Sequence, residues 1–546
     1  MNKLEKLFDN HPILISFALM TICLVRVMLL RDFSPSNELR YLSIADEALR
    51  DGHFFAFFNQ GVAYADKPPL YFWLIMFCRK VFGTHSMLAL CMFSYVPALV
   101  IIRVMDSWVR PEGALRRAAM ALMAGTCALF LGSSVFLRMD MLMCMFIVLS
   151  LYSFHLLYSG EGNRKIQRLL LPVWIFMGLF TKGPVGILTP IVGILCFLIV
   201  KRDWKGLGEY LGWRTWGVMA ALCALWFTAV YLDGGKDYLN NLLFHQTVDR
   251  AVNAYHHKQP LWYYLISVWY SVAPYCLLLA GAVVCSFLKT DGRARTDSEL
   301  LFLTVTASTF VMLSVFSGKL AIYLMPVFPF MVYLFPLILR RFGWKTWMGW
   351  ALAAPAALFA VLGLGAALLF GVFGNASLLE DLLKDSPYLV RGWALAGMAT
   401  LGLFNLLALV SRIRKKPWER TVTAMACSML LAAFCASGVM PEVNVYTAYG
   451  SLCAAVPENG DVVTLHVRRP ENMDVYLGRD VVDFAKDIDA FLASDYVEDT
   501  ADSPALGTFT LVVKESKVNS DERLKAFVGG CSVSRVGQWC VAVKSR

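Results

Sequence analysis

The chain has few charged residues for its length of 546: only 16% are Asp, Glu, Lys or Arg, against about 25% in a typical soluble domain. Hydrophobic residues make up 58%, more than the roughly 45–50% of soluble proteins. This imbalance excludes an ordinary soluble protein and predicts an integral membrane protein. The net charge of +10 does not indicate a nucleic-acid partner, because membrane proteins collect Lys and Arg in their cytoplasmic loops.

The sequence also lacks any CxxC pair or Cys/His spacing typical of a zinc site, although it contains 14 cysteines. Most of them stand singly in apolar segments, where a free cysteine behaves as a small hydrophobic residue. Cys531 and Cys540 lie in a polar tail and could pair in an oxidising compartment. No small-residue cleavage site follows the first apolar run, so we expect a retained first span rather than a removed signal peptide.

A membrane-spanning helix needs about 20 apolar residues, and the sequence predicts thirteen such segments. They cover residues 12–30, 87–105, 116–135, 141–158, 168–181, 184–200, 213–232, 261–287, 299–316, 322–339, 347–373, 391–411 and 420–440. The segment 70–83 is aromatic and short, and it ends in Arg79 and Lys80. We therefore predict that it forms a helix in the membrane interface rather than a span.

The distribution of basic residues tests this topology. With a cytoplasmic N-terminus and thirteen spans, every inner loop contains Lys or Arg, including 110–117, 340–345 and 412–420. If 70–83 also spanned, the next basic loop would fall on the outer side, against the positive-inside rule. The tail, about 441–546, then lies outside the membrane. Its alternating apolar stretches predict a small α/β domain, which follows a transmembrane domain of residues 1–440.

Polar residues that are unusual for a membrane protein gather in the outer loops of this topology. These loops are 31–86, 136–140, 233–260 and 317–321, and Lys182 joins them at a break between two apolar segments. An ionisable residue at the edge of a span is costly and is a functional hint by default. Two acids on separate loops, Glu38 and Asp140, lie beside apolar spans and could act as a base or stabilise a developing positive charge.

Several cations accompany these acids and suit the binding of a phosphate and of a phosphate leaving group. They are Lys67, Lys182, Arg250 and Lys319. A substrate linked to a lipid phosphate and entering from the bilayer would need this combination. Asp66 and His245 could in addition hold a divalent metal.

Six motifs in order make the chain similar to a known family. They are NELRY, DKPPLYFW, RMD, GLFTKGPVG, HHKQPLWYY and SGKLAIYLMPVFP. Together they resemble the membrane glycosyltransferases that move 4-amino-4-deoxy-L-arabinose from undecaprenyl phosphate to lipid A. These are relatives of the protein O-mannosyltransferases and have the GT-C type fold. The resemblance implies about thirteen transmembrane helices, a periplasmic tail domain and a bacterial inner-membrane location.

The resemblance also assigns roles to individual positions. It implies catalytic roles for Asn37, Glu38 and Asp140. Donor-phosphate binding is implied for Lys67, Arg250 and Tyr323, with Arg40 and Tyr41 beside them, and substrate contact for His257. Lys182 and Lys319 are further candidates for substrate contact because of their charge and their place in the same loops. Asn37 departs from the family pattern, which has an acid there, and Asn cannot accept a proton as a base. Either Glu38 and Asp140 carry the acidic function, or an anionic acceptor needs no base.

Simpler interpretations stand beside these. Glu38 could pair with Arg40 on the surface, Asp140 could cap the fourth span, and Lys67 could extend to lipid headgroups. The favoured function is an inverting glycosyltransferase acting on lipid A or another envelope acceptor. The alternatives are a protein O-glycosyltransferase of the same fold and a transporter or flippase for a lipid-linked sugar. A transporter would be expected to place charges near the midplane and to contain internal repeats, whereas here the charges cluster on one face.

Overall fold

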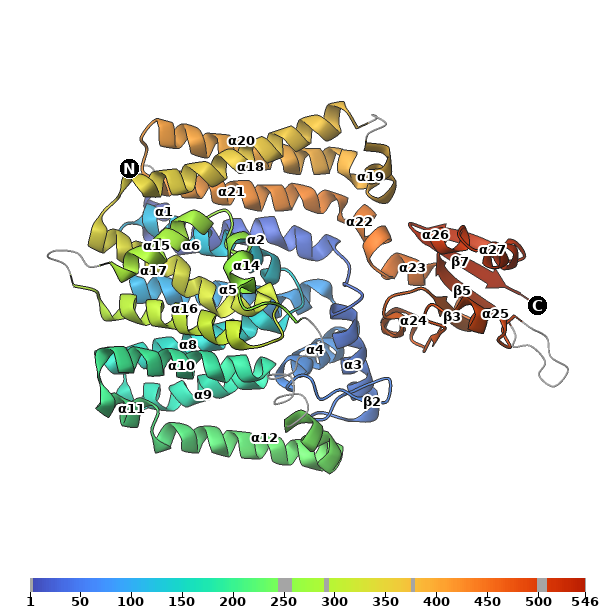
Figure 1. The fold of residues 1–546 in the computed structure, drawn as a ribbon, viewed down its shortest axis with the longest axis horizontal. Helices are drawn as coiled ribbons and strands as arrows, with labels where there is room; N and C mark the ends of the chain where they lie inside the picture. Colours follow the sequence, from blue (N-terminus) through green and yellow to red (C-terminus); the bar gives the residue numbers. More distant parts are fainter. Residues whose placement is uncertain (1–2, 244–257, 289–293, 375–378, 498–507, 546) are drawn as a thin grey trace.

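The computed structural model describes residues 3–243, 258–288, 294–374, 379–497 and 508–545. Long helices run side by side through the larger part of the molecule, and a small sheet domain lies at one end (Figure 1). This arrangement confirms the prediction of a mainly α, polytopic membrane protein with a small C-terminal α/β domain.

Among the described residues, ten helical segments are long and apolar enough to cross a membrane. Such segments are helical because a backbone inside lipid must satisfy its own hydrogen bonds. The ten are α2 (Pro12–Leu30), α5 (Met87–Val109), α8 (Met139–Ser159), α10 (Pro184–Lys201), α11 with α12 (Trp204–Tyr210 and Trp213–Asn240), α16 (Asp297–Val315), η2 with α17 (Ala321–Val327 and Phe328–Phe342), α18 (Thr346–Val372), α20 (Gly392–Ile413), and α21 with η5 and α22 (Trp418–Ala436, Ser437–Val439 and Met440–Thr447).

Three of the thirteen predicted spans differ from continuous apolar helices. The predicted span 116–135 is a pair of helices, α6 (Ala114–Thr126) and α7 (Ala128–Ser134), bent by 75°. The span 261–287 is divided into α14 (Tyr263–Ser271) and α15 (Cys276–Phe287). The span 168–181 lies in α9 (Arg164–Lys182). This helix is not among the ten apolar segments because its first turns contain Arg and Lys residues.

The two broken helices meet at their breaks. The backbone N–H of Ala128 donates to the carbonyl of Ala273 at 2.9 Å. The hydroxyls of Thr126 and Tyr275 lie 2.9 Å apart and share a hydrogen bond. Backbone groups released by a break in a membrane helix need such partners, so each break satisfies the other.

Helix α17 forms the centre of the bundle, since 89% of its most apolar window is buried, against 28% for α18 and for α20. Helices α18, α20 and α21 pack side by side in one layer (Figure 1). Glycines allow this close approach: a Cβ added at Gly363 would lie 2.5 Å from the backbone nitrogen of Gly402. Small residues serve the same purpose at many membrane helix interfaces.

The first long loop folds into short elements at the same end of the bundle as the sheet domain (Figure 1). They are α3 (Glu38–Asp51), the hairpin of β1 (Phe58–Asn59) and β2 (Val62–Ala63), and α4 (Leu70–Phe82). At about 1.5 Å per residue, the 13 residues of α4 are too short to cross a hydrocarbon core of about 30 Å. This length agrees with the prediction that 70–83 does not span.

The C-terminal domain is built on a five-stranded sheet in the order β4-β3-β5-β7-β6. Strand β3 is parallel to β4 and β5, and β7 is antiparallel to β5 and β6. The strands are β3 (Asp461–Leu465), β4 (Val482–Asp483), β5 (Phe509–Lys514), β6 (Ser532–Val536) and β7 (Trp539–Lys544). Cys531 and Cys540 are both free thiols here, so the possible disulfide is not formed in this structure.

Short helices complete the described chain. They are α1 (Lys3–Asn10), α19 (Glu380–Asp385), η4 (Pro387–Val390), α23 (Gly450–Ala454), η6 (Pro470–Met473), α24 (Asp474–Leu477), α25 (Ile488–Leu492), α26 (Glu515–Val518) and α27 (Glu522–Gly529).

The sheet domain is fixed to the first loop by polar contacts and by a shared apolar core. Ser43 on α3 donates to Asp474 at 2.6 Å, and the amide of Asn472 donates to the carbonyl of Pro35 at 2.8 Å. Tyr449 and Trp539 of the domain belong to the same buried cluster as residues of α3 and α4. The loop that carries the candidate site is therefore held from the membrane side and from the domain side.

Asp474 makes this contact sensitive to pH. Burial raises the pKa of Asp474 to about 6, opposed by the Ser43 hydrogen bond and reinforced by the nearby Asp46 and Asp480. A raised carboxyl pKa means that the folded protein binds the proton more tightly than the unfolded chain, so stability falls as pH rises from about 4 through about 6. We predict that Asp474→Asn raises the Tm of the detergent-solubilised protein by roughly 1–2 °C at pH 7.5. The gain should shrink toward pH 5.

The matched control is Asp495→Asn, which changes an exposed carboxylate of the same domain. Its Tm should follow that of the wild type at every pH. A difference between Asp474→Asn and wild type that stays constant from pH 5 to pH 7.5 would contradict the prediction.

Candidate active site

Asp140 lies at the centre of the candidate site. It stands in the first turn of α8 and is only 2% exposed, and a carboxylate is favoured at a helix N-terminus. It is not the cap of this helix, because Arg138 occupies that position and no side-chain cap bond is formed. The carboxylate instead forms ion pairs with Lys182 and, at 3.5 Å, with the Nε of Arg138.

Lys182 connects Asp140 to a third part of the chain. It is the last residue of α9, where a cation is favoured by the helix dipole. Its Nζ lies 4.8 Å from the centre of the Tyr323 ring, which belongs to η2. The fold thus brings together Asp140, Lys182 and Tyr323, as expected for residues that share one site.

The first loop supplies a second group of polar residues beside Asp140. Lys67 pairs with Asp66 at 2.9 Å, and the hydroxyl of Tyr64 donates to the same carboxylate oxygen at 3.1 Å. The guanidinium of Arg40 lies 5.6 Å from the ring centre of Tyr64 and 5.9 Å from that of Tyr41. The loop therefore holds its acids, cations and tyrosines in one connected group.

Lys67 links this group to the buried carboxylate. Its charge interacts electrostatically with both Asp140 and Lys182. Three cations, Lys67, Lys182 and Arg138, thus act on a single buried acid. Because Asp66 offsets only one of them, the site keeps a surplus of positive charge, which suits a phosphate group.

Glu38 has a different environment from Asp140. Its carboxylate is 1% exposed and accepts two hydrogen bonds from Arg31, at 2.8 and 2.6 Å. The backbone N–H groups of Ser34 and Leu137 donate to it at 2.8 and 2.7 Å. The partner of Glu38 is therefore Arg31 and not Arg40, so the simple interpretation of a Glu38–Arg40 surface pair is wrong.

These contacts give Glu38 a positioning function. They connect the start of α3 with the turn that leads into Asp140, three residues after Leu137. The Nε of Arg31 also donates to the carbonyl of Val135 in the same turn, at 3.0 Å. Four donors occupy the carboxylate, so accepting a proton from a substrate would require breaking them. The sequence reasoning missed Arg31, although an Arg directly after the first span was a signal for it.

The remaining predicted residues are placed less centrally or lie outside the described parts of the chain. Asn37 is exposed at the start of α3 and accepts a hydrogen bond from Arg40 at 3.3 Å. Lys319 is buried and donates to the carbonyl of Gln259 at 3.0 Å, which ties two loops together. Three predicted residues lie outside the described residues: His245, Arg250 and His257.

A divalent metal stays a prediction. Among the described residues, no three His, Cys, Asp or Glu side chains gather as potential ligands. Asp66 is the described member of the predicted pair, and its Oδ2 already accepts from Tyr64 and Lys67.

Comparison with known proteins shows that the chain is similar to membrane glycosyltransferases. No protein-family model matches it. It is 27% identical over 396 residues to an undecaprenyl phosphate-alpha-4-amino-4-deoxy-L-arabinose arabinosyl transferase of Pseudomonas aeruginosa strain UCBPP-PA14. This match covers 66% of each chain. A transferase of the same name from Enterobacter sp. strain 638 is 23% identical over 431 residues, which are 76% of this chain and 73% of the relative.

The fold is similar to a solved structure along nearly its whole length. The crystal structure of ArnT from Cupriavidus metallidurans bound to undecaprenyl phosphate has a TM-score of 0.75 and covers 97% of each chain at 17% identity. The apo form of the same protein gives a TM-score of 0.72. The chain thus has the fold of this protein, in agreement with the predicted GT-C type fold. In sequence the chain is similar to the aminoarabinose transferases, as its six motifs predicted.

We predict that Glu38→Ala destabilises the protein by about 3–5 kcal/mol, because it leaves the buried Arg31 without its carboxylate partner. Unfolding of the detergent-solubilised protein, followed by tryptophan fluorescence, measures this loss. Glu442→Ala is the control, since it removes one partner of the exposed pair with Arg391 and such pairs contribute little. Equal stability of Glu38→Ala and wild type would disprove the positioning function.

Proposed function

We propose that the chain is a polyprenyl-phosphate-dependent glycosyltransferase that moves a sugar from the lipid-linked donor to lipid A. The observation that carries this proposal is Asp140, buried against Lys182 and Arg138 and within electrostatic reach of Lys67. One acid among several cations can serve a reaction in which a phosphate leaves and a nucleophile attacks. The names of the curated relatives and the ligand in the similar crystal structure support the donor class.

The site residues have two functions in the reaction: some hold the donor phosphate, and others act on the acceptor. Lys67, with the predicted Arg250 and Tyr323, holds the donor phosphate and stabilises its charge as it leaves. An oxygen of the acceptor attacks the anomeric carbon from the face opposite the phosphate, forming the new C–O bond with inversion. The electron pair of the breaking bond goes to the phosphate oxygen, and polyprenyl phosphate is released.

The function of Asp140 depends on the acceptor. If the acceptor is a hydroxyl, Asp140 takes its proton as the bond forms. If the acceptor is a lipid A phosphate, its attacking oxygen is already anionic. Asp140 then orients the neighbouring cations instead of taking a proton. The exposed Asn37 then needs no acidic function.

We also propose that the site faces the periplasm of the bacterial inner membrane, with the N-terminus cytoplasmic and the C-terminal domain outside. The basic loops 110–117, 340–345 and 412–420 support this orientation because cytoplasmic loops are enriched in Lys and Arg.

We predict that Asp140→Asn lowers the transfer rate at least about 100-fold, the order expected for a group that moves a proton or stabilises developing charge. Mass spectrometry of lipid A compares cells with the gene, without the gene and with Asp140→Asn. We expect loss of the same sugar-sized mass in the deletion and in the variant. Asp51→Asn, an exposed carboxylate on α3, is the control and should retain the modification.

The outcomes separate the acceptor from the catalytic residue. Lipid A that is unchanged by the deletion would exclude it as the acceptor and favour a protein hydroxyl or another envelope glycan. A mass that is lost in the deletion but kept in Asp140→Asn would remove Asp140 from the mechanism.

Binding of the donor phosphate gives an independent test. We predict that Lys67→Gln weakens binding of undecaprenyl phosphate by about 10-fold or more, because a charge-assisted hydrogen bond is lost. Asp140→Asn should bind it at least as tightly as wild type, since one negative charge has left the site. Titration of the purified protein with a fluorescent undecaprenyl phosphate measures both.

Lys80→Gln is the control for the binding test, because Lys80 is an exposed lysine near the end of α4. If Lys67→Gln and Lys80→Gln bind the lipid phosphate equally well, Lys67 does not contact the phosphate.

A further inference from the structure

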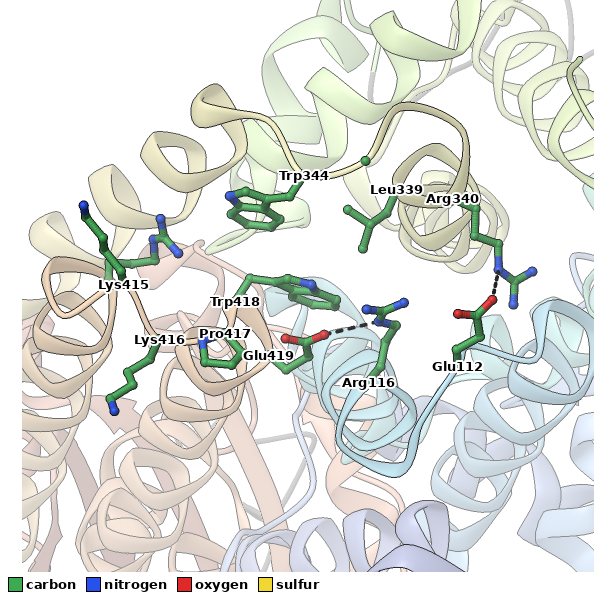
Figure 2. Close-up of a pocket in the computed structure, with 12 residues that line it drawn as sticks. Glu112, Arg116, Leu339, Arg340, Trp344, Lys415, Lys416, Pro417, Trp418 and Glu419 are labelled. Atoms are coloured by element: carbon green, nitrogen blue, oxygen red, sulfur yellow. Dashed lines mark hydrogen bonds and ion pairs between the residues drawn. The ribbon is translucent and has the colours of Figure 1, made fainter. Parts of the chain in front are cut away.

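A cationic cavity lies at the end of the bundle opposite to Asp140. It has a volume of about 890 Å³ and is formed where the loops α5–α6, α17–α18 and α20–α21 meet (Figure 2). Helix α8 begins at the candidate active site and is 21 residues long. At about 1.5 Å per residue, the opposite end of the bundle lies about 30 Å from that site. It therefore belongs to neither the donor nor the acceptor site proposed above.

The charges that line this cavity do not cancel. Five cationic side chains face two acids, Glu112 and Glu419. Arg116 pairs with Glu419 at 3.2 Å, and Arg340 lies 3.9 Å from Glu112 (Figure 2). The other three cations make no ion pair with any residue that the structure describes: Arg412, Lys415 and Lys416.

Aromatic rings stand beside the unpaired cations. The rings of Trp344 and Trp418 are stacked with centroids 6.2 Å apart and an angle of 7° between their planes. The guanidinium of Arg412 lies 5.3 Å from the centre of the Trp344 ring. Tryptophan is favoured at the level of lipid headgroups, where one side of the ring meets lipid and the other meets water.

We propose that this cavity binds the headgroup of an anionic glycerophospholipid from the leaflet opposite to the active site. Arg412, Lys415 and Lys416 would hold the phosphate, while Trp344 and Trp418 pack against the glycerol and the first carbons of the acyl chains. Basic pockets between the ends of transmembrane helices bind anionic headgroups in this way. A lipid fits better than free phosphate because the aromatic rings offer apolar contact that an inorganic ion cannot use.

Native mass spectrometry of the purified full chain in detergent tests this site. The probes are phosphatidylglycerol, cardiolipin and phosphatidylcholine, each titrated at equal concentration. Wild type should retain the anionic lipids in preference to phosphatidylcholine, with one saturable site. Lys415→Gln combined with Lys416→Gln should lower this preference about 30-fold, because two lysines that attract an anionic headgroup are lost.

The control removes the same charge from the same end of the bundle but outside the cavity. Lys165→Gln combined with Lys205→Gln changes two exposed lysines and should leave the lipid preference of wild type intact. An equal loss in both double variants would mean that general surface charge attracts the lipid and would overturn the proposal. The absence of any preference in the wild type would overturn it as well.

Inorganic phosphate distinguishes the two sources of the anion. At millimolar concentration it should not displace bound phosphatidylglycerol from the wild type. Displacement that is lost together with Lys415 and Lys416 would assign the cavity to a soluble phosphate instead of a lipid.

Discussion

The buried ion pair between Arg31 and Glu38 is the interaction on which the candidate site depends. It joins the end of the first span to the start of α3, and through the N–H of Leu137 it reaches the turn before Asp140. A buried pair gives little net stability compared with apolar residues, but it is costly to break. Its value here is geometric: it fixes two loops that are about a hundred residues apart in sequence.

The same principle explains why Asp140 can remain buried. An isolated carboxylate removed from water would be very unfavourable, so the fold places Lys182 and Arg138 against it. The cations of the site are not all neutralised, so a phosphate that enters the site would neutralise the remaining positive charge. The ion pairs of the free protein and the binding of an anionic substrate thus come from one arrangement of charges.

Much of this fold could be predicted from the sequence because apolar length and basic loops are local signals. Each predicted span coincides with one helix or with consecutive helices, and 70–83 is a short helix as expected. The breaks between α6 and α7 and between α14 and α15 were missed because Ala128 and Ala273 satisfy each other across the bundle. Such a contact leaves no trace in the hydrophobicity of either segment.

The sequence indicated which acids stand out beside the apolar spans, but not the partners that each of them has. Glu38 and Asp140 are both acids beside apolar spans, and only their partners separate them: four donors hold Glu38, whereas Asp140 faces cations. Partners from distant segments, such as Leu137 for Glu38 and Lys182 for Asp140, cannot be read from spacing. At the opposite end of the bundle, Arg412, Lys415 and Lys416 show that a local sequence signal can also indicate a site. The loops that indicate orientation also concentrate enough positive charge beside tryptophan rings to form a site for an anionic headgroup.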